Sequence, residues 1–268
     1  MVQFEEFMEK IVLVTGAGSG MGRATAIAFA QQGANIVVND IDYEAARSVA
    51  QEIETMGRRS LPVKCDVSNS REVSEMVDQI VKQFGTLHIL INNAGVAGAA
   101  KLMEATSEEE FDRTMDINMK SVFLCSKAAV PLMKKNAYGK IVNVASIVAK
   151  RTPSGSGGEY AASKAAVLSL TRTFAYELAP YGINVNAICP GRTITPMAVE
   201  TSEHKERLKK IPYGRYGTPE DQANAIILLC SDRASYLVGQ HIDVDGGLLL
   251  SWTDFESYKE AHKGKRVV

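Results

Sequence analysis

The stretch Ile11–Gly22, IVLVTGAGSGMG, decides the fold of this chain. It opens with a short apolar run rich in β-branched residues, which predicts a buried strand. Four glycines follow, and Ala24–Gln32 then has the small residues and the period of a helix. A tight turn between a strand and a helix brings the backbone and a helix N-terminus close to a phosphate. Because the spacing of Gly16, Gly20 and Gly22 is not G-x-G-x-x-G, a purely structural turn stays an alternative.

The same alternation of apolar runs and helical segments continues along the chain. Strands separated by helices need crossovers, so they form a parallel sheet covered on both faces. We predict an α/β fold, a doubly wound parallel seven-stranded sheet, as a single domain over residues 1–250 with a C-terminal tail over 251–268. The predicted strands are 11–15, 35–39, 61–65, 88–91, 140–145, 183–188 and 241–244, and the predicted helices are 24–32, 44–56, 70–84, 109–134, 160–179 and 219–230.

Composition excludes several classes of function. Thirty basic and 31 acidic residues give a net charge of −1, so nucleic-acid binding is not expected. No apolar run reaches the ~18 residues of a membrane span, and MVQFEEFMEK lacks the features of a signal peptide. We therefore expect a cytoplasmic protein. The four cysteines and four histidines are dispersed without metal-ligand spacing, so neither a metal site nor a disulfide is predicted.

Asp40 ends the second predicted strand, 20 residues after Gly20. A carboxylate at this place can accept both hydroxyls of an adenosine ribose and repels a 2′-phosphate. Neither Ser19 nor Ile41 supplies a cation for such a phosphate, and Arg23 lies inside the helix. The sequence therefore favours NAD over NADP, with an ordinary turn residue at Asp40 as the alternative.

Tyr160 and Lys164 stand four residues apart at the start of a predicted helix, so they share one face. An ammonium near a phenol lowers the tyrosine pKa from its reference of about 10. A tyrosine of this kind suits proton transfer near neutral pH. An ordinary surface pair is the alternative.

The chain resembles the short-chain dehydrogenase/reductase superfamily in its single-domain form. The resemblance implies a Rossmann-type fold and a nicotinamide cofactor. The motifs that carry it, in the order and spacing of the family, are Thr15-Gly16…Gly20-Met21-Gly22, Cys65-Asp66-Val67, Asn92-Asn93-Ala94-Gly95, Asn118, Ser146, Tyr160-Ala161-Ala162-Ser163-Lys164, Pro190-Gly191…Thr195 and Asp245-Gly246-Gly247.

The resemblance implies four catalytic roles. Tyr160 is the acid/base that protonates a carbonyl oxygen or deprotonates an alcohol, and Lys164 lowers its pKa and hydrogen-bonds the nicotinamide ribose. Ser146 hydrogen-bonds the substrate oxygen, and it is the sole candidate because position 145 is Ala, where many relatives have Ser. Asn118 holds a water that links Lys164 to solvent.

It also implies the contacts of the cofactor. Asp66 meets the adenine amino group, and Thr195 lies near the nicotinamide amide or the pyrophosphate. The expected cofactor-binding residues are Gly16, Gly18, Ser19, Gly20, Met21, Gly22, Asp40, Asp66, Val67, Asn93, Ala94, Gly95, Tyr160, Lys164, Pro190, Gly191, Thr193 and Thr195.

Two segments, 147–159 and 192–217, are expected to shape the substrate pocket, the second as a lid. Arg151 and Arg192 lie beside the catalytic and nicotinamide positions and could hold a carboxylate, phosphate or sulfonate. The alternative is that they face water or pair with Glu200 or Glu159. The lid is charged and offers little apolar surface, which favours a small polar alcohol over a greasy substrate.

Three functions remain open. The main hypothesis is an NAD-dependent oxidoreductase that interconverts a secondary alcohol (a polyol, sugar or hydroxy acid, including anionic ones) and its carbonyl. The alternative is a reductase of 3-oxoacyl thioesters or ketosteroids. A non-catalytic dinucleotide sensor is the third, and the intact catalytic set argues against it. The resemblance also implies a homotetramer or homodimer paired through helices 109–134 and 160–179.

Overall fold

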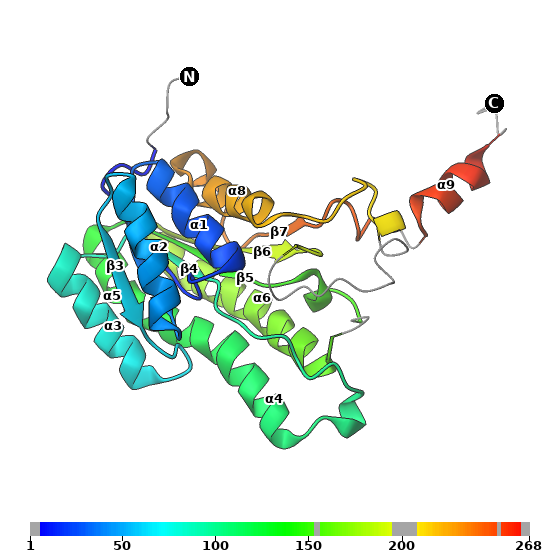
Figure 1. The fold of residues 1–268 in the computed structure, drawn as a ribbon, viewed down its shortest axis with the longest axis horizontal. Helices are drawn as coiled ribbons and strands as arrows, with labels where there is room; N and C mark the ends of the chain where they lie inside the picture. Colours follow the sequence, from blue (N-terminus) through cyan, green and yellow to red (C-terminus); the bar gives the residue numbers. More distant parts are fainter. Residues whose placement is uncertain (1–5, 153–155, 195–207, 251–252, 264–268) are drawn as a thin grey trace.

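The computed structural model describes residues 6–152, 156–194, 208–250 and 253–263. Its centre is one parallel sheet in the strand order β3-β2-β1-β4-β5-β6-β7 (Figure 1). Starting from β1, the chain adds β2 and β3 on one side and then β4 to β7 on the other side. Ligands of such folds bind outside the carboxyl ends of the strands at this switch point between β1 and β4. The strands are β1 (Ile11–Val14), β2 (Asn35–Asp40), β3 (Ser60–Lys64), β4 (Ile89–Asn92), β5 (Gly139–Val144), β6 (Ile183–Pro190) and β7 (His241–Val244).

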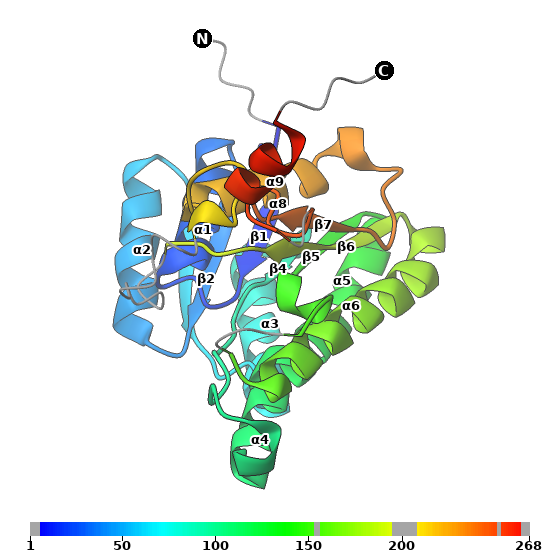
Figure 2. The ribbon, with the colours of Figure 1, turned by 90° about the vertical axis from the view of Figure 1, so that its right-hand side faces the viewer.

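Helices cover both faces of the sheet (Figure 2). One face carries α1 (Gly20–Gln31), α2 (Tyr43–Thr55) and α8 (Pro219–Cys230), and the other carries α3 (Ser70–Phe84), α5 (Ser121–Asn136) and α6 (Gly158–Leu178). Each face has its own apolar layer, because buried parallel strands present apolar side chains to both sides. This confirms the predicted doubly wound α/β fold.

The predicted helix over 109–134 is interrupted. The structure has α4 (Glu108–Met115), a π-helical turn at Asp116–Lys120, and then α5. A π turn inserts one residue into the helical repeat, and such turns cluster at functional sites. Here the turn carries Asn118, which is fully buried. Apolar residues continue on both sides of the turn, which is why the sequence predicts a single helix.

The C-terminal segment holds a helix that the sequence treats only as tail. Helix α9 (Phe255–His262) begins at an Asp254 cap whose side chain accepts the Ser257 N–H at 2.9 Å. It extends away from the sheet and its covering helices (Figure 1). The boundary at about residue 250 stays a prediction. In the described ranges, no helix combines the length and the apolar character needed to cross a bilayer.

Candidate active site

A cleft of about 520 Å³ opens at the carboxyl ends of the central strands. Its walls come from the turn after β1 and the ends of β2, β4, β5 and β6, together with the start of α6. The predicted residues that line it are Gly16, Ser19, Gly20, Met21, Gly22, Asp40, Asp66, Val67, Asn93, Ala94, Gly95, Ser146, Tyr160, Lys164, Pro190, Gly191 and Thr193.

The glycine-rich turn has no room for a side chain at Gly22, but it leaves the N-terminus of α1 free to bind a ligand. A Cβ on Gly22 would lie 2.1 Å from the Gly16 carbonyl oxygen, so the turn admits no side chain there. The Asn93 amide donates to the carbonyls of Thr15 and Gly16, at 2.8 and 3.0 Å. Ser19 begins α1 without a side-chain cap, which leaves the first N–H groups of the helix available to an anion. These features fit a dinucleotide pyrophosphate.

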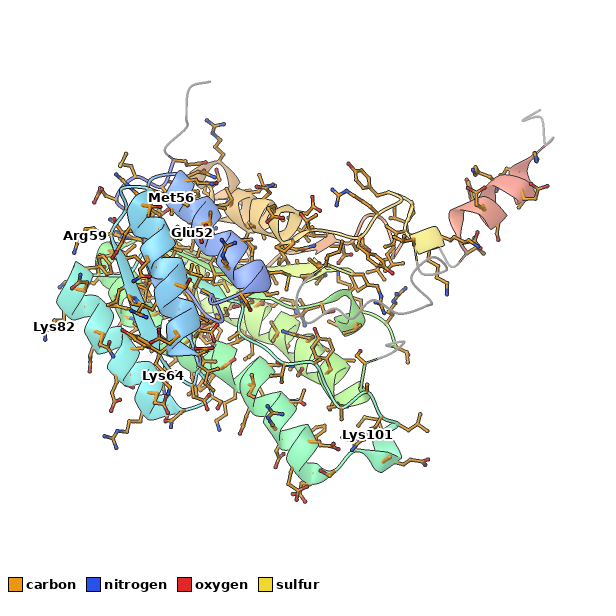
Figure 3. All side chains as sticks on the ribbon, in the orientation of Figure 1. Glu52, Met56, Arg59, Lys64, Lys82 and Lys101 are labelled. Carbon is orange, nitrogen blue, oxygen red and sulfur yellow. The ribbon has the colours of Figure 1, made fainter. Side chains whose placement is uncertain are left out.

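Asp40 lies where a ribose would be recognised. One carboxylate oxygen accepts the Gly18 N–H at 2.8 Å and the other accepts the Asp42 N–H at 3.1 Å. Gly18 itself does not line the cleft, but a Cβ there would lie 2.8 Å from the Asp40 carboxylate. Arg23 pairs instead with Glu52 on α2 at 2.6 Å (Figure 3, where Glu52 is labelled).

The adenine side of the cleft carries Asp66 and Val67. One oxygen of Asp66 accepts from the Ser68 N–H at 2.9 Å and from its hydroxyl at 2.7 Å. Among the described residues the other oxygen has no hydrogen bond, so it can accept from a ligand. Val67 is buried and supplies an apolar surface beside it.

Lys164 is buried, and Tyr160 beside it is half-buried at the cleft wall. The Lys164 ammonium donates to the Val144 carbonyl at 2.9 Å and lies 5.8 Å from the centre of the Tyr160 ring. Burial lowers the pKa of Lys164 to about 8. Burial also raises the pKa of Tyr160, and the Ser146 hydroxyl opposes that shift. Lys164 makes no contribution to this shift, so the expected lowering of the Tyr160 pKa by Lys164 is not found in the structure.

Asn118 binds the loop that follows β4. Its carbonyl oxygen accepts the Val96 N–H at 2.8 Å, and its amide donates to the Val96 carbonyl at 3.0 Å. The same amide donates to the Ser163 hydroxyl at 3.1 Å, and that hydroxyl donates to the Tyr160 carbonyl at 2.7 Å. A polar chain thus joins the loop to the catalytic helix. The water expected at Asn118 stays a prediction.

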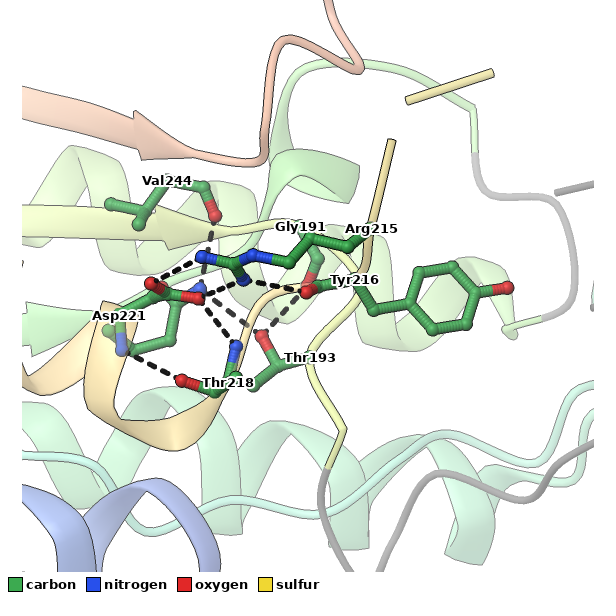
Figure 4. A network of polar contacts seen from close by, with 8 residues as sticks. Gly191, Thr193, Arg215, Tyr216, Thr218, Asp221 and Val244 are labelled. Atoms are coloured by element: carbon green, nitrogen blue, oxygen red, sulfur yellow. Dashed lines mark hydrogen bonds and ion pairs between the residues drawn. The ribbon is translucent and has the colours of Figure 1, made fainter. Parts of the chain in front are cut away.

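A network behind β6 holds the far wall of the cleft (Figure 4). The amide of Gln222, buried on α8, donates to the Thr193 hydroxyl at 3.2 Å and to the Val244 carbonyl at 3.1 Å. Thr193 lines the cleft, and its hydroxyl donates to the Gly191 carbonyl at 3.4 Å. Gln222 was not predicted from the sequence, because it stands in the polar first turn of α8, where a polar residue gives no signal of burial.

The predicted substrate residues are not in the cleft. Arg151 is exposed, and Arg192 lies 5.9 Å from the centre of the Tyr216 ring. Neither is among the described residues that line the cleft. Thr195 and half of the predicted lid, residues 195–207, fall outside the described residues.

Nine further residues line the cleft without having been predicted. Most of them flank the predicted motifs, so their neighbours were the available signal. They are Asn39, Ile41, Cys65, Val96, Ala97, Arg113, Ile117, Val144 and Ala145.

Metal ligation has no candidate in the described part of the chain, where no three His, Cys, Asp or Glu side chains gather. All four cysteines are buried and free. Burial raises the pKa of the Cys189 thiol to about 11, which keeps it protonated at neutral pH.

Comparison with known proteins agrees with this geometry. Residues 16–249 match a family model described as Enoyl-(Acyl carrier protein) reductase. The chain is 40% identical over 243 residues to the 3-oxoacyl-[acyl-carrier-protein] reductase FabG of Thermotoga maritima, covering 90% of this chain and 98% of the relative. It is also 40% identical over 242 residues to the (2S)-[(R)-hydroxy(phenyl)methyl]succinyl-CoA dehydrogenase subunit BbsD of Thauera aromatica, with coverages of 89% and 96%.

Solved structures of reductases and dehydrogenases also have the fold of this chain. A 3-oxoacyl-[acyl-carrier protein] reductase with bound NAD from Brucella melitensis superposes with a TM-score of 0.87 at 32% identity, covering 93% of this chain and 94% of that one. A short-chain type dehydrogenase/reductase from Mycobacterium marinum has a TM-score of 0.87 at 35% identity, with coverages of 93% and 99%. The chain belongs to the short-chain dehydrogenase/reductase superfamily and is an oxidoreductase.

Proposed function

We propose that the protein interconverts 3-oxoacyl and 3-hydroxyacyl thioesters with NAD as its cofactor. The observation that carries the proposal is the placing of Ser146, Tyr160 and Lys164 together at the wall of a cleft that fits a dinucleotide. The thioester is supported by the names of the relatives, one a 3-oxoacyl-[acyl-carrier-protein] reductase and one a hydroxyacyl-CoA dehydrogenase subunit. These names support the thioester alternative better than the small polar alcohol that the lid composition favoured.

The residues of the chain supply the acid/base chemistry. A bound nicotinamide supplies the hydride chemistry of the reaction. In reduction the Tyr160 phenol gives its proton to the substrate oxygen, and in oxidation the phenolate takes it back. Ser146 and Tyr160 both line the cleft, and the Ser146 hydroxyl is close enough to act on the pKa of Tyr160, so we infer that both hydroxyls bind one substrate oxygen. Two donors aimed at that oxygen stabilise the negative charge that develops on it.

NAD is supported over NADP by the charges around the ribose position. Asp40 is held in the cleft wall by the N–H groups of Gly18 and Asp42, so it cannot easily turn away from a 2′-phosphate. Among the described lining residues, the cations are Arg113 on α4 and Lys164 beside Tyr160. Neither belongs to the segments that flank Asp40.

Turnover with a defined thioester tests the proposal. Acetoacetyl-CoA is mixed with NADH or NADPH, and the loss of reduced-nicotinamide absorbance is recorded. We expect consumption of NADH, with NADPH at least ~10-fold less efficient in kcat/KM. Asp40→Ala should reduce the ratio of kcat/KM with NADH to kcat/KM with NADPH, while the exposed Asp78→Asn should leave this ratio unchanged. Turnover confined to polyols, sugars or hydroxy acids would overturn the thioester, and a preference for NADPH would overturn the role of Asp40.

A homotetramer is part of the same proposal. Apolar side chains are exposed on the pair of long helices: Phe123 on α5 is 40% exposed and Tyr176 on α6 is 85% exposed. The Phe123 ring lies 6.4 Å from that of Phe174 on α6, so these two rings form one apolar patch across the two helices. Light scattering at micromolar concentration should give four times the chain mass. A monomeric mass would contradict the tetramer and leave the catalytic proposal intact.

A further inference from the structure

The carboxylate of Glu159 is buried directly beside the catalytic Tyr160. It lies in the first turn of α6 with no exposed surface. One oxygen accepts the Ala99 N–H at 2.5 Å, and the other is buried without a hydrogen bond among the described residues. Burying a carboxylate without full hydrogen bonding destabilises the folded protein, so packing alone does not explain why Glu159 is at this place.

Two glycines make room for this carboxylate. A Cβ on Gly98, in the loop after β4, would lie 2.2 Å from one of its oxygens. A Cβ on Gly157, the residue that begins α6, would lie 2.1 Å from the other. The carboxylate therefore fills the narrow space between the loop and the N-terminus of α6. The positive end of the helix dipole favours a negative group at that place.

The loop after β4 is anchored at three successive points. Thr15 accepts the N–H groups of Asn93 and Ala94, at 3.0 Å each. Asn118 binds Val96 through both of its backbone groups. Glu159 accepts the N–H of Ala99. Of these three parts of the loop, the first borders the glycine-rich turn, whereas the second and third face the catalytic helix.

The far part of the loop is strained. Ala100 has a φ of 53°, in the left-handed region that residues with a Cβ avoid. Such a conformation persists only where its surroundings impose it. The Glu159 hydrogen bond immediately precedes Ala100, and the next residue, Lys101, pairs with Glu110 on α4 at 2.6 Å (Figure 3, where Lys101 is labelled). The strained residue is thus held from both sides.

We propose that Glu159 is a positioning residue that clamps the loop after β4 to the catalytic helix and so fixes the substrate wall opposite Tyr160. Val96 and Ala97 line the cleft, and they lie between the Asn118 anchor at Val96 and the Glu159 anchor at Ala99. The clamp works through a hydrogen-bond acceptor, since only one carboxylate oxygen has a partner in the described part of the chain. This inference rests on the proposed oxidoreductase function.

Glu159→Ala tests the clamp. It leaves the Ala99 N–H unpaired and should raise KM for acetoacetyl-CoA roughly 10-fold, with a smaller fall in kcat. The Kd for NADH, measured by fluorescence titration, should stay unchanged because Thr15 anchors the cofactor side independently. Glu159→Gln keeps an acceptor for Ala99 and should restore KM. Glu177→Ala, on the exposed surface of the same helix, is the matched control.

Gly157→Ala reaches the same clamp without removing the carboxylate. Its φ of −70° suits alanine, and the three atoms nearest to the added Cβ all belong to the Glu159 carboxylate. The methyl group should push the carboxylate off Ala99 and reproduce the KM defect of Glu159→Ala. In the Glu159→Ala background, the same substitution should add almost nothing.

Three results would overturn the clamp: Glu159→Gln as defective as Glu159→Ala, unchanged KM in Glu159→Ala with only a lower Tm, or a weakened Kd for NADH. Amide hydrogen exchange over residues 95–101 gives a readout that needs no substrate. It should accelerate in Glu159→Ala and stay as in the wild type in Glu177→Ala. If the wild type turned over no thioester, the proposed function would fail, and exchange alone would still decide the clamp.

Discussion

The nucleotide half and the catalytic half of the cleft are held together by different kinds of contact. In the nucleotide half, backbone meets backbone at van der Waals limits, as where Gly22 passes the Gly16 carbonyl. In the catalytic half, single side chains reach across the fold to hold loops, as Asn118 does at Val96 and Gln222 at Thr193. The Asn93 amide also binds the glycine-rich turn, but glycines set the shape of the nucleotide half, whereas single side-chain hydrogen bonds hold the loops of the catalytic half.

This difference decides how each half responds to change. A turn built on steric limits fails when any atom is added to it, whatever the chemistry of that atom. A loop held by one hydrogen bond fails only when that donor or acceptor is lost, and a substitution that keeps the acceptor can preserve it. Substitutions should therefore separate cofactor binding from turnover, depending on the half in which they fall.

The largest expected effect is in the catalytic half. Tyr160→Phe removes the phenol and leaves the ring, so kcat for acetoacetyl-CoA should fall by about 10³-fold or more. The Kd for NADH should change less than about 3-fold, because the glycine-rich turn and Asp40 are untouched. Stopped-flow or steady-state kinetics and a fluorescence titration measure the two values. A variant with nearly full turnover would contradict the role of Tyr160 as the acid/base.

The next effect is its counterpart in the nucleotide half. Gly22→Ala places a methyl group 2.1 Å from the Gly16 carbonyl and 2.5 Å from the Asn93 amide, so the turn must open. We expect the Kd for NADH to rise about 100-fold, which is close to 3 kcal/mol. Gly57→Ala is the control: its φ of 77° strains an added side chain, but open space surrounds it and it does not line the cleft. It should lower Tm and leave the Kd unchanged.

The same division explains what the sequence could predict. Gly16, Gly20 and Asp40 act through local geometry that follows directly from their order in the chain, so they were predicted with their strand and helix. Gln222 and Glu159 act on residues brought to them by tertiary structure, Thr193 and Ala99, and no spacing along the chain reveals those partners. From the sequence, Glu159 was considered only as a partner for an arginine.

Other differences have a related cause. Hydrophobic pattern alone predicts one helix over 109–134, because apolar residues continue on both sides of the π turn that places Asn118. The lowering of the Tyr160 pKa by Lys164 was inferred from their spacing, whereas burial depends on the whole fold and dominates here. The doubly wound parallel class of the sheet could be predicted, since alternating strands and helices leave few topologies.

The buried ammonium of Lys164 gives a third prediction. Its pKa is about 8 in the folded protein, against an ordinary value of 10.5 for a solvated lysine, so the unfolded chain binds more protons between these values. Wild-type stability should therefore rise with pH across this window. Lys164→Met has no titrating group at this position, so its stability does not gain from the rise in pH. The free energy of unfolding of Lys164→Met relative to wild type should therefore fall by up to about 3 kcal/mol from pH 8 to 10.5.

Thermal unfolding of both proteins at about pH 7.5 and pH 10 brackets that window and measures the change. Lys135→Met, on the exposed surface of α5, is the control and should show no such trend relative to wild type. A constant difference between Lys164→Met and wild type across the window would mean that Lys164 is not desolvated as the structure has it. The experiment tests the burial of Lys164 in the catalytic half and needs no substrate.

The smallest effect concerns the network behind β6. The Arg215 guanidinium, followed by the Thr218 N–H, holds the pKa of Asp221 at about 2 (Figure 4). A carboxyl whose pKa is lowered on folding stabilises the protein above its unfolded value, 3.8, and that stability is lost as pH falls toward 2. Asp221→Asn keeps an acceptor for the Thr218 N–H and removes the charge that pairs with Arg215.

Since the Asp221 and Arg215 side chains are 34% and 47% exposed, solvent screens the pair, and the loss at pH 7 should be only about 0.5 kcal/mol. Urea unfolding at about pH 7 and pH 3 should show that loss shrinking toward the lower pH, with Asp78→Asn as the matched control. Turnover should be unchanged, because Gln222 rather than Asp221 holds Thr193 at the cleft. A loss of turnover would show that the ion pair, and not the buried amide, positions this wall.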